Sequence, residues 1–461
     1  MRGMTRRTFL RSALAASSVC AARGVWGESA GGVSSRPPNI IFILADDLGY
    51  GDLGCYGQRE IQTPNLDRMA SEGMRFSQAY AGSTVCAPSR GCLLTGLHTG
   101  HARIRGNGDF PLHPEDVTVA EVLKKAGYST AVIGKYGLGD YNTTGAPWRQ
   151  GFDFCYGYLN HLHAHNYYPE FLWRNDTREA VPGNREAREG QPPERRVYSH
   201  DLFTEEALRF IESHREGPFF LYLAYTIPHA NNERGKLEGV GMEVPSDEPY
   251  RDRPWPQAQR NHAAMITRLD RDVGRLLDRL RALGLEENTV VFFSSDNGPH
   301  KEGGADPSFF RSTGGLRGYK RDLYEGGIRV PFLVYGKGRV PAGQVCDVPI
   351  AFWDVMPTLA ACAGVTLDVP TDGLNLAPLL EGKTKALPRE YFYWEFHERG
   401  FAQAVRFGDW KAVRLKREGP VELYNLAEDV YEMNNVAELH PQEVQHAVKL
   451  FEEARTAPNE A

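Results

Sequence analysis

The sequence predicts an α/β fold: a mixed, largely parallel central sheet with helices on both faces, followed by a smaller C-terminal α+β domain with a short antiparallel sheet. Three observations predict it. Continuous apolar runs alternate with amphipathic helical patterns up to about residue 384, as expected when strands are buried on both faces. Beyond that point the pattern changes to short aromatic strands. With 461 residues, the chain is longer than a domain built on a single hydrophobic core usually is. A content of 41% apolar and 24% charged residues excludes disordered, collagen-like and coiled-coil chains.

The larger domain is expected over residues 36–384. Its predicted strands are apolar runs, at residues 39–44, 129–133, 219–224 and 289–293. Thr63 and Pro64 begin a predicted helix that Gly73 ends, Thr118 and Glu121 form a capping box for a helix ending at Gly127, and residues 261–283 form a long amphipathic helix. Two polar stretches rich in Gly and Pro, residues 170–196 and 231–257, are predicted to be long functional loops.

The smaller domain is expected over residues 385–461. Its predicted strands are residues 391–396, 402–406 and 411–414, and a helix follows at 441–455. The short, aromatic character of these strands favours an antiparallel sheet.

The first 27 residues have the pattern of an export signal. They contain five arginines and no acidic residue, and Arg6 and Arg7 precede a stretch of small and apolar residues, which is typical of twin-arginine signals. The protein is therefore expected to use the twin-arginine export machinery and to be periplasmic or extracellular in a bacterium. Losing those arginines takes the formal charge from −6 to about −11, which disfavours nucleic acid as a partner. No run of 18 apolar residues predicts a membrane span.

The cysteines do not indicate a zinc or redox site. There are seven, and none forms a C-x-x-C pair. Twin-arginine export carries proteins folded in a reducing cytosol, so disulfides are not expected. Outside the signal we expect buried apolar cysteines, with Cys86 as the exception.

Acidic residues follow two of the predicted buried strands. Asp46 and Asp47 come after the first strand, and Asp296 and Asn297 come after the strand at 289–293. Ligands gather outside the carboxyl ends of strands in an open α/β sheet. Taken alone, the first pair is equally explained by an Asp that caps the next turn. Together the four oxygen-bearing side chains favour Ca²⁺, with Mg²⁺ as the alternative, over zinc.

The segment Cys86-Ala87-Pro88-Ser89-Arg90 is the most informative motif. Pro88 belongs in the first turn of a helix, so Cys86 is predicted at a helix N-terminus, where free N–H groups and the helix dipole favour anions. The segment C-A-P-S-R-G-C-L-L-T-G resembles the signature of the Cys-type sulfatases, in the alkaline phosphatase superfamily. Further segments are similar to that family, among them N-I-I-F-I-L-A-D-D-L-G, G-K-Y-G-L-G, I-P-H, S-S-D-N-G and L-R-G-Y-K-R-D-L-Y-E-G-G-I-R-V-P.

The resemblance implies that a formylglycine-generating or sulfatase-maturating enzyme oxidises Cys86 to formylglycine, whose hydrated aldehyde is the nucleophile. A diol beside a divalent cation has a lowered pKa. One hydroxyl would attack sulfur, and the other would then expel sulfate as the aldehyde re-forms. Since export moves folded chains, this maturation is expected in the cytosol.

The resemblance also assigns roles to four cationic or titratable residues. Arg90 would orient the nucleophile beside the metal, Lys135 and Lys320 would bind sulfate oxygens, and His229 would protonate the leaving alcohol. One position departs from the family pattern K-W-H-L-G, because Gly137 occupies the place of the histidine that assists sulfate elimination. Either another group performs that task or the step relies on the metal and Asp296. We expect a nearby histidine to reach into the gap.

Three histidines at alternate positions form the other unusual segment. In an extended stretch His161, His163 and His165 would point to one side. They are predicted to line a sugar subsite, with a structural polar loop as the main alternative and metal binding as a lesser one; His300 is a weaker candidate for the same rim.

The sequence therefore predicts an exported sulfuric ester hydrolase acting on O-sulfate groups of a carbohydrate. Two alternatives stay open. One is a phosphomonoester, phosphodiester or phosphonate hydrolase of the same superfamily, which the single metal site and lysines disfavour. The other is an inactive sulfoglycan-binding homologue.

Overall fold

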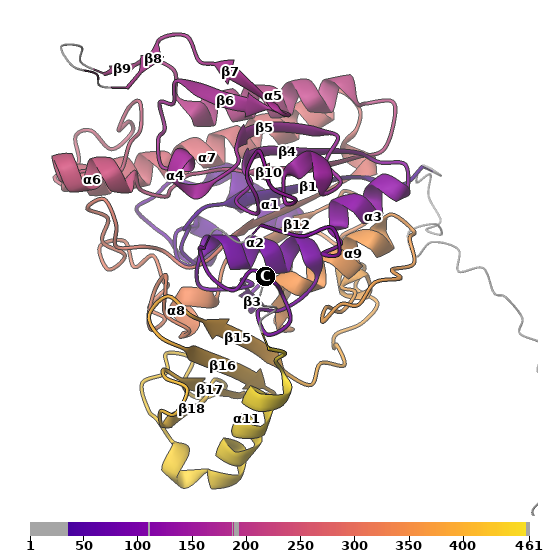
Figure 1. The fold of residues 1–461 in the computed structure, drawn as a ribbon, viewed down its shortest axis with the longest axis vertical. Helices are drawn as coiled ribbons and strands as arrows, with labels where there is room; N and C mark the ends of the chain where they lie inside the picture. The colour runs from indigo at the N-terminus through magenta and orange to yellow at the C-terminus, as the bar shows by residue number, and fades with distance from the viewer. Residues whose placement is uncertain (1–35, 109–110, 187, 189–192, 458–461) are drawn as a thin grey trace, which may run out of the picture.

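The computed structural model describes residues 36–108, 111–186, 188 and 193–457, and a sheet of ten strands crosses its larger part (Figure 1). The predicted signal at residues 1–27 lies outside the described residues. The sheet order is β13-β2-β12-β11-β1-β10-β4-β5-β6-β7. Its strands are β1 (Asn39–Ala45), β2 (Met74–Phe76), β4 (Ser129–Lys135), β5 (Phe154–Tyr158), β6 (Phe171–Arg174), β7 (Thr177–Ala180), β10 (Phe219–Ala224), β11 (Thr289–Ser295), β12 (Phe332–Tyr335) and β13 (Gln344–Cys346).

The centre of this sheet is parallel and its flanks are mixed, which confirms the predicted fold class. Strands β11, β1, β10, β4 and β5 run parallel, and β12, β6 and β7 pair antiparallel to their neighbours. In the middle, Ile41 of β1 lies between Leu221 and Val291. The parallel strands therefore end at one edge, where loops can bring their polar residues together.

Helices cover both faces of the sheet. Helices α1, α5 and α7 pack with Ile41 and Ile43 on one face, and α2, α3, α9 and α10 pack with Ile40 and Phe42 on the other. The helices are α1 (Pro64–Glu72), α2 (Cys86–Thr95), α3 (Val119–Lys125), α4 (His161–Ala164), α5 (Ser199–Ser213), α6 (Asn232–Glu238), α7 (Gln257–Ala282), α8 (Glu325–Ile328), α9 (Val355–Cys362), α10 (Ala377–Leu380) and α11 (Pro441–Glu453).

The two stretches predicted as long loops contain secondary structure. Residues 170–196 include β6 and β7 as a hairpin and the short pair β8 (Asn184–Arg185) and β9 (Glu194–Arg195). Residues 231–257 include α6, whose first turn is capped by the Asn231 side chain. The loop predictions were wrong because β6 has only four residues, and because the polar strands β7, β8 and β9 and the capped helix α6 lack apolar periodicity. Helix α7 begins at Gln257, four residues before the predicted start.

The C-terminal part forms a separate antiparallel sheet below the larger sheet (Figure 1). It contains β15 (Phe392–Phe396), β16 (Ala402–Phe407), β17 (Trp410–Arg414) and β18 (Val421–Asn425), and α11 packs on it. The fourth strand was not predicted, and the boundary at residue 385 stays a prediction. A two-stranded sheet joins β3 (Ala79–Tyr80) to β14 (Ile350–Ala351). Among the described residues, no helix is sufficiently long and apolar to cross a membrane.

Buried charges connect the C-terminal sheet to the larger domain. Lys411 of β17 is fully buried, and its Nζ lies 2.9 Å from carboxylate oxygens of both Glu325 and Glu432. Glu325 begins α8, and the backbone N–H of Gly298 donates to Gly327 O in the same helix. The small sheet thus supports the segment next to Asp296 and Asn297.

Candidate active site

The two acidic pairs meet at the carboxyl edge of the sheet, as predicted. Strands β1 and β11 pair in register up to Ala45 and Ser295, so their following residues lie side by side. The backbone N–H of Asp47 donates to Asp296 Oδ1 at 3.0 Å, and Asn297 Nδ2 donates to Asp47 Oδ1 at 2.7 Å. Asp47 has φ 64°, a conformation that turns the chain sharply after the strand.

These residues fit a hard divalent cation. The side chains of Asp46, Asp47 and Asp296 are buried, and so is Asn297, whose Oδ1 accepts no hydrogen bond from the protein. Carboxylate and amide oxygens are preferred ligands of Ca²⁺ and Mg²⁺. Ligand atoms of Asp46, Asp47, Cys86 and His229 lie within 4.8 Å of one another. Asp296 lies beside them, and its Oδ2 accepts two hydrogen bonds from Arg90.

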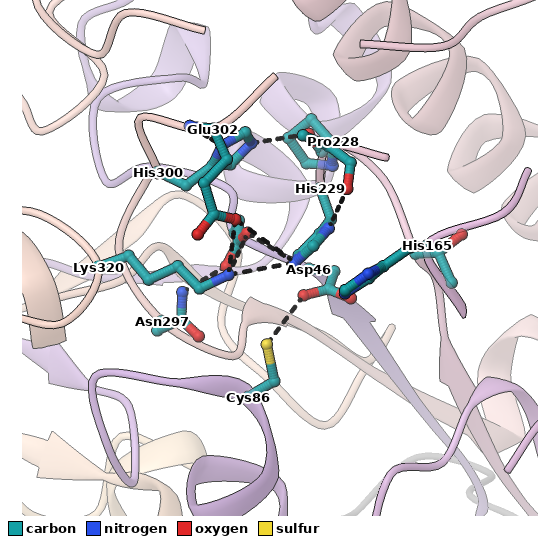
Figure 2. A network of polar contacts seen from close by, with 12 residues as sticks. Asp46, Cys86, His165, Pro228, His229, Asn297, His300, Glu302 and Lys320 are labelled. Carbon is teal, nitrogen blue, oxygen red and sulfur yellow. Dashed lines mark hydrogen bonds and ion pairs between the residues drawn. The ribbon is translucent and has the colours of Figure 1, made fainter. Parts of the chain in front are cut away.

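Cys86 lies at the first residue of α2, as the motif predicted. The Ser89 hydroxyl accepts a hydrogen bond from Gly82 N at 3.1 Å, which ties the preceding loop to the helix. The Sγ of Cys86 is 3.4 Å from Asp46 Oδ1 (Figure 2). Burial and the nearby Asp46 carboxylate raise the pKa of this thiol well above its ordinary value. A protonated thiol is a weak nucleophile, so the surroundings of Cys86 do not favour a reactive thiolate at this position.

Three cations surround Cys86 and the acidic residues. Arg90, one helical turn beyond Cys86, donates to Asp296 Oδ2 at 2.7 and 3.0 Å and to the carbonyl of Lys135 at 2.6 Å. Lys135 Nζ donates to Asp46 Oδ2 at 2.7 Å, and Lys320 Nζ donates to Asp47 Oδ2 at 2.8 Å. All three side chains are buried. The structure therefore brings every predicted cation into one cluster that suits a small oxyanion.

His229 lies between Lys320 and the surrounding imidazoles. Its Nδ1–H donates to Ala230 O at 2.6 Å, and its Nε2 is 3.1 Å from Lys320 Nζ. Burial and Lys320 lower the pKa of His229 well below its usual range. Its ring stacks on His165, 4.9 Å between centroids, and lies 5.8 Å from the His300 ring. His300 in turn donates to the Pro228 carbonyl at 3.2 Å, so it supports the His229 loop.

The arrangement predicted for the histidine segment was wrong. Residues 161–164 form the short helix α4, capped by the Asn160 side chain, which accepts from His163 N. A helical turn spreads side chains around an axis, so the three histidines point to different places. The His163 ring packs against the aromatic rings of Tyr158 and Phe171, whereas His165 donates to Glu233 at 3.0 Å and stacks on His229.

His161 occupies the gap left by Gly137. A Cβ built on Gly137, which has φ +80°, would lie 3.1 Å from His161 Cε1 and 3.8 Å from Arg90 Cδ. The histidine expected in this gap is thus present, contributed by α4.

Glu302 was missed by the sequence reasoning. Its carboxylate lies 3.6 Å from Lys320 Nζ and 3.9 Å from His229 Nε2, and it accepts a bond from Arg321 at 2.5 Å. Although burial opposes the shift, Lys320 helps to lower the pKa of Glu302 to about 2. Only its proximity to D-N-G-P in the sequence hinted at a place in the site.

Comparisons with known proteins agree with this geometry. The sulfatase family model matches residues 38–365, and the model described as "N-sulphoglucosamine sulphohydrolase, C-terminal" matches residues 317–456. The chain is 30% identical to the N-acetylgalactosamine-6-O-sulfatase of Bacteroides thetaiotaomicron, over 92% of this chain and 94% of that protein. It is 36% identical to human arylsulfatase A, over 83% of this chain and 76% of that protein.

A solved structure is similar along the whole fold. The crystal structure of Ps i-CgsB in complex with k-i-k-neocarrahexaose superposes with a TM-score of 0.77 at 28% identity, covering 92% of this chain and 94% of that one. Family match, relatives and site geometry agree on one assignment: the chain belongs to the sulfatase family, the formylglycine-dependent sulfuric ester hydrolases of the alkaline phosphatase superfamily.

Proposed function

We propose that this protein removes O-sulfate groups from a carbohydrate by using formylglycine formed from Cys86 and one divalent cation, Ca²⁺ or Mg²⁺. The observation that supports this most directly is the convergence of Cys86, Asp46 and three buried cations within one small cluster. A bound cation would be held by Asp46, Asp47, Asp296 and Asn297 and would lower the pKa of a hydroxyl at residue 86.

The residues around position 86 have complementary tasks. Lys135 and Lys320 donate hydrogen bonds to the carboxylates of Asp46 and Asp47, respectively. With a divalent cation held by those carboxylates, both ammonium groups would be available to bind sulfate oxygens. Arg90 donates hydrogen bonds to both the Asp296 carboxylate and the Lys135 carbonyl, and so holds these two residues in place relative to each other. Such preorganised charges stabilise an anionic transition state without reorganisation.

Protonation of the leaving alcohol is assigned to His229 together with Lys320. Their nitrogens are 3.1 Å apart, and the carbonyl of Ala230 fixes the imidazole orientation. As the S–O bond breaks, a proton from the Lys320 ammonium would pass through Nε2 to the leaving oxygen, which departs as the alcohol. Lys320 is then neutral and regains its proton from solvent. The Tyr167 hydroxyl, which donates to the His229 carbonyl, supports this loop.

Polar side chains around the buried cations support a carbohydrate as the leaving group. Glu302, Arg321 and Glu398 form a charged chain, with Arg321 3.8 Å from Glu398 and Glu302 at the inner end. Glu233 bonds to His165, whose ring stacks on His229. Alternating carboxylate and guanidinium groups suit hydroxyl-rich ligands, because they accept and donate hydrogen bonds. The N-acetylgalactosamine-6-O-sulfatase relative and the structure in complex with k-i-k-neocarrahexaose are consistent with this substrate class.

Sulfate release from a panel of sulfated mono- and disaccharides tests the proposal. We expect turnover of at least one sulfated sugar and of an aryl sulfate, and none by Cys86→Ala. A higher kcat/KM for the matching aryl phosphate or phosphonate would favour the alternative hydrolase instead. Binding of sulfated sugars without turnover, by chains whose residue 86 is shown to be formylglycine, would favour an inactive binding protein.

We further propose that the protein is exported through the twin-arginine route after Cys86 has been oxidised in the cytosol. The N-terminal arginine pair supports the route, and the burial of Cys86 in the folded chain supports the order, because a maturating enzyme needs access to that segment. Mass spectrometry of the cytosolic precursor should find formylglycine; an unmodified thiol there would contradict the order.

A further inference from the structure

The pairing of two strands of the sheet determines what lies beside Gly137, next to Arg90. Pairing of β4 with β5 continues past the strand ends, since Tyr136 N donates to Tyr158 O and Gly137 N donates to Leu159 O. Residues 136–137 are therefore held alongside residues 158–159, and α4 begins two residues later. This register places His161 against Gly137.

His161 carries a nitrogen that the fold leaves unused. Its Nδ1 is buried without a hydrogen-bond partner in the protein, and it lies 3.7 Å from the Cβ position of residue 137. A buried polar atom without a partner destabilises the folded chain, so its retention calls for a ligand or a reacting group. Burial, together with Lys135 and Arg90, lowers the pKa of His161 well below its usual range, which leaves a free lone pair on the ring.

The gap that His161 fills lies on the reacting face of α2. Cys86 and Arg90 are four residues apart in that helix and share one face, and the gap reaches within 3.8 Å of Arg90 Cδ. Two other imidazoles near the site, those of His229 and His300, already use both of their ring nitrogens. His229 bonds Ala230 and Lys320, and His300 bonds Pro228 and the N–H of Glu302.

We propose that His161 is the catalytic base that releases sulfate from residue 86; this inference rests on the proposed function. After the ester S–O bond has been cleaved, sulfate is attached to one hydroxyl oxygen of the hydrated formylglycine. His161 takes the proton of the second hydroxyl, and that O–H electron pair forms the C=O bond. The C–O bond to sulfate breaks, and sulfate leaves with its electrons. Water then adds to the aldehyde, and the imidazolium proton passes to solvent.

The test separates formation of the sulfated residue from its breakdown. His161→Gln and His161→Ala are prepared with the formylglycine content of the residue-86 peptide measured beforehand, and both are mixed with an aryl sulfate. We expect a burst of phenol close to one equivalent per formylglycine, followed by turnover reduced about 100-fold or more. Intact-mass analysis should show the added mass of one SO₃ group on the residue-86 peptide, and added imidazole should speed its loss in His161→Ala.

Two controls make the outcome specific. Leu162→Ala changes an exposed neighbour in α4 and should show normal turnover and no sulfated peptide. His229→Ala impairs the first step and should not accumulate the adduct. Folded, formylglycine-bearing His161→Gln that shows a raised KM with unchanged kcat, or slow turnover without any sulfated peptide, overturns the assignment. Absence of sulfate release by the unsubstituted enzyme would instead count against the proposed function itself.

Discussion

Replacing Lys411 by methionine tests whether the small sheet is fastened to the larger domain by a buried charge. The Lys411 Nζ lies 2.9 Å from Glu325 and 2.9 Å from Glu432, with all three side chains fully buried. Burial raises the pKa of Glu432 to about 7, whereas Lys411 and Arg329, acting against burial, lower the pKa of Glu325 to about 2. At neutral pH the lysine therefore compensates mainly Glu325.

Methionine keeps the volume of the side chain and removes its charge. Breaking a buried ion pair in this way costs about 3–5 kcal/mol, and the remaining Glu325–Arg329 pair at 3.2 Å points to the lower end. For a cooperative unit of roughly 400 residues, the entropy of unfolding is about 0.8 kcal/mol per kelvin, so a loss of about 3–4 kcal/mol lowers Tm by about 4–5 °C. Calorimetry at one scan rate measures it.

The matched control is Lys449→Met, since the Lys449–Glu453 pair is exposed at 3.7 Å and should shift Tm by less than 1 °C. The loss in Lys411→Met should also be smaller at pH 6 than at pH 8. At the lower pH Glu432 binds a proton and the cluster carries less unbalanced negative charge. Equal Tm losses in the two variants, or a larger loss at pH 6, would refute this account of the interface.

Three further predictions concern the metal, the leaving group and acid stability. Chelation with EDTA should lower both Tm and kcat, the latter at least 100-fold, with recovery on adding Ca²⁺ or Mg²⁺; full activity in EDTA would contradict the metal site. His229→Ala should reduce kcat on a sugar sulfate by about 10²–10⁴, but much less on 4-nitrophenyl sulfate, whose leaving group needs no proton; equal losses on the two substrates would exclude the acid role. Burial lowers the pKa of His98 to about 4, so the unfolded chain binds more protons between about pH 6.5 and 4. Stability should therefore fall through that window, by about 2 kcal/mol from this group at pH 5; a His98→Gln chain with the same fall between pH 7 and 5 would show that another group is responsible.

Local patterns accounted for much of the fold and for the reacting residues. The apolar run of β1 and the acidic residues directly after it are adjacent in the chain, so strand burial and the place of Asp46 follow from one short segment. The same holds for Cys86 and Arg90, which Pro88 places on the first turns of one helix. The position of such a side chain can be predicted from the sequence, because the periodicity of the helix or strand that carries it fixes the direction in which it points.

Contacts between segments far apart in the chain could not be predicted from these local patterns. His161 faces Gly137 only because β4 and β5 pair in one particular register, and α4 forms only because Asn160 caps a turn that alternation alone suggested was extended. Glu302 and Lys411 are ordinary charged residues in their own segments, and they acquire a role from partners that other parts of the chain contribute. Sequence periodicity thus determined the buried central strands, the long helices and the residues that lie at their ends. The tertiary structure decided which of those residues meet, because burial and charge pairing depend on neighbours far apart in the chain.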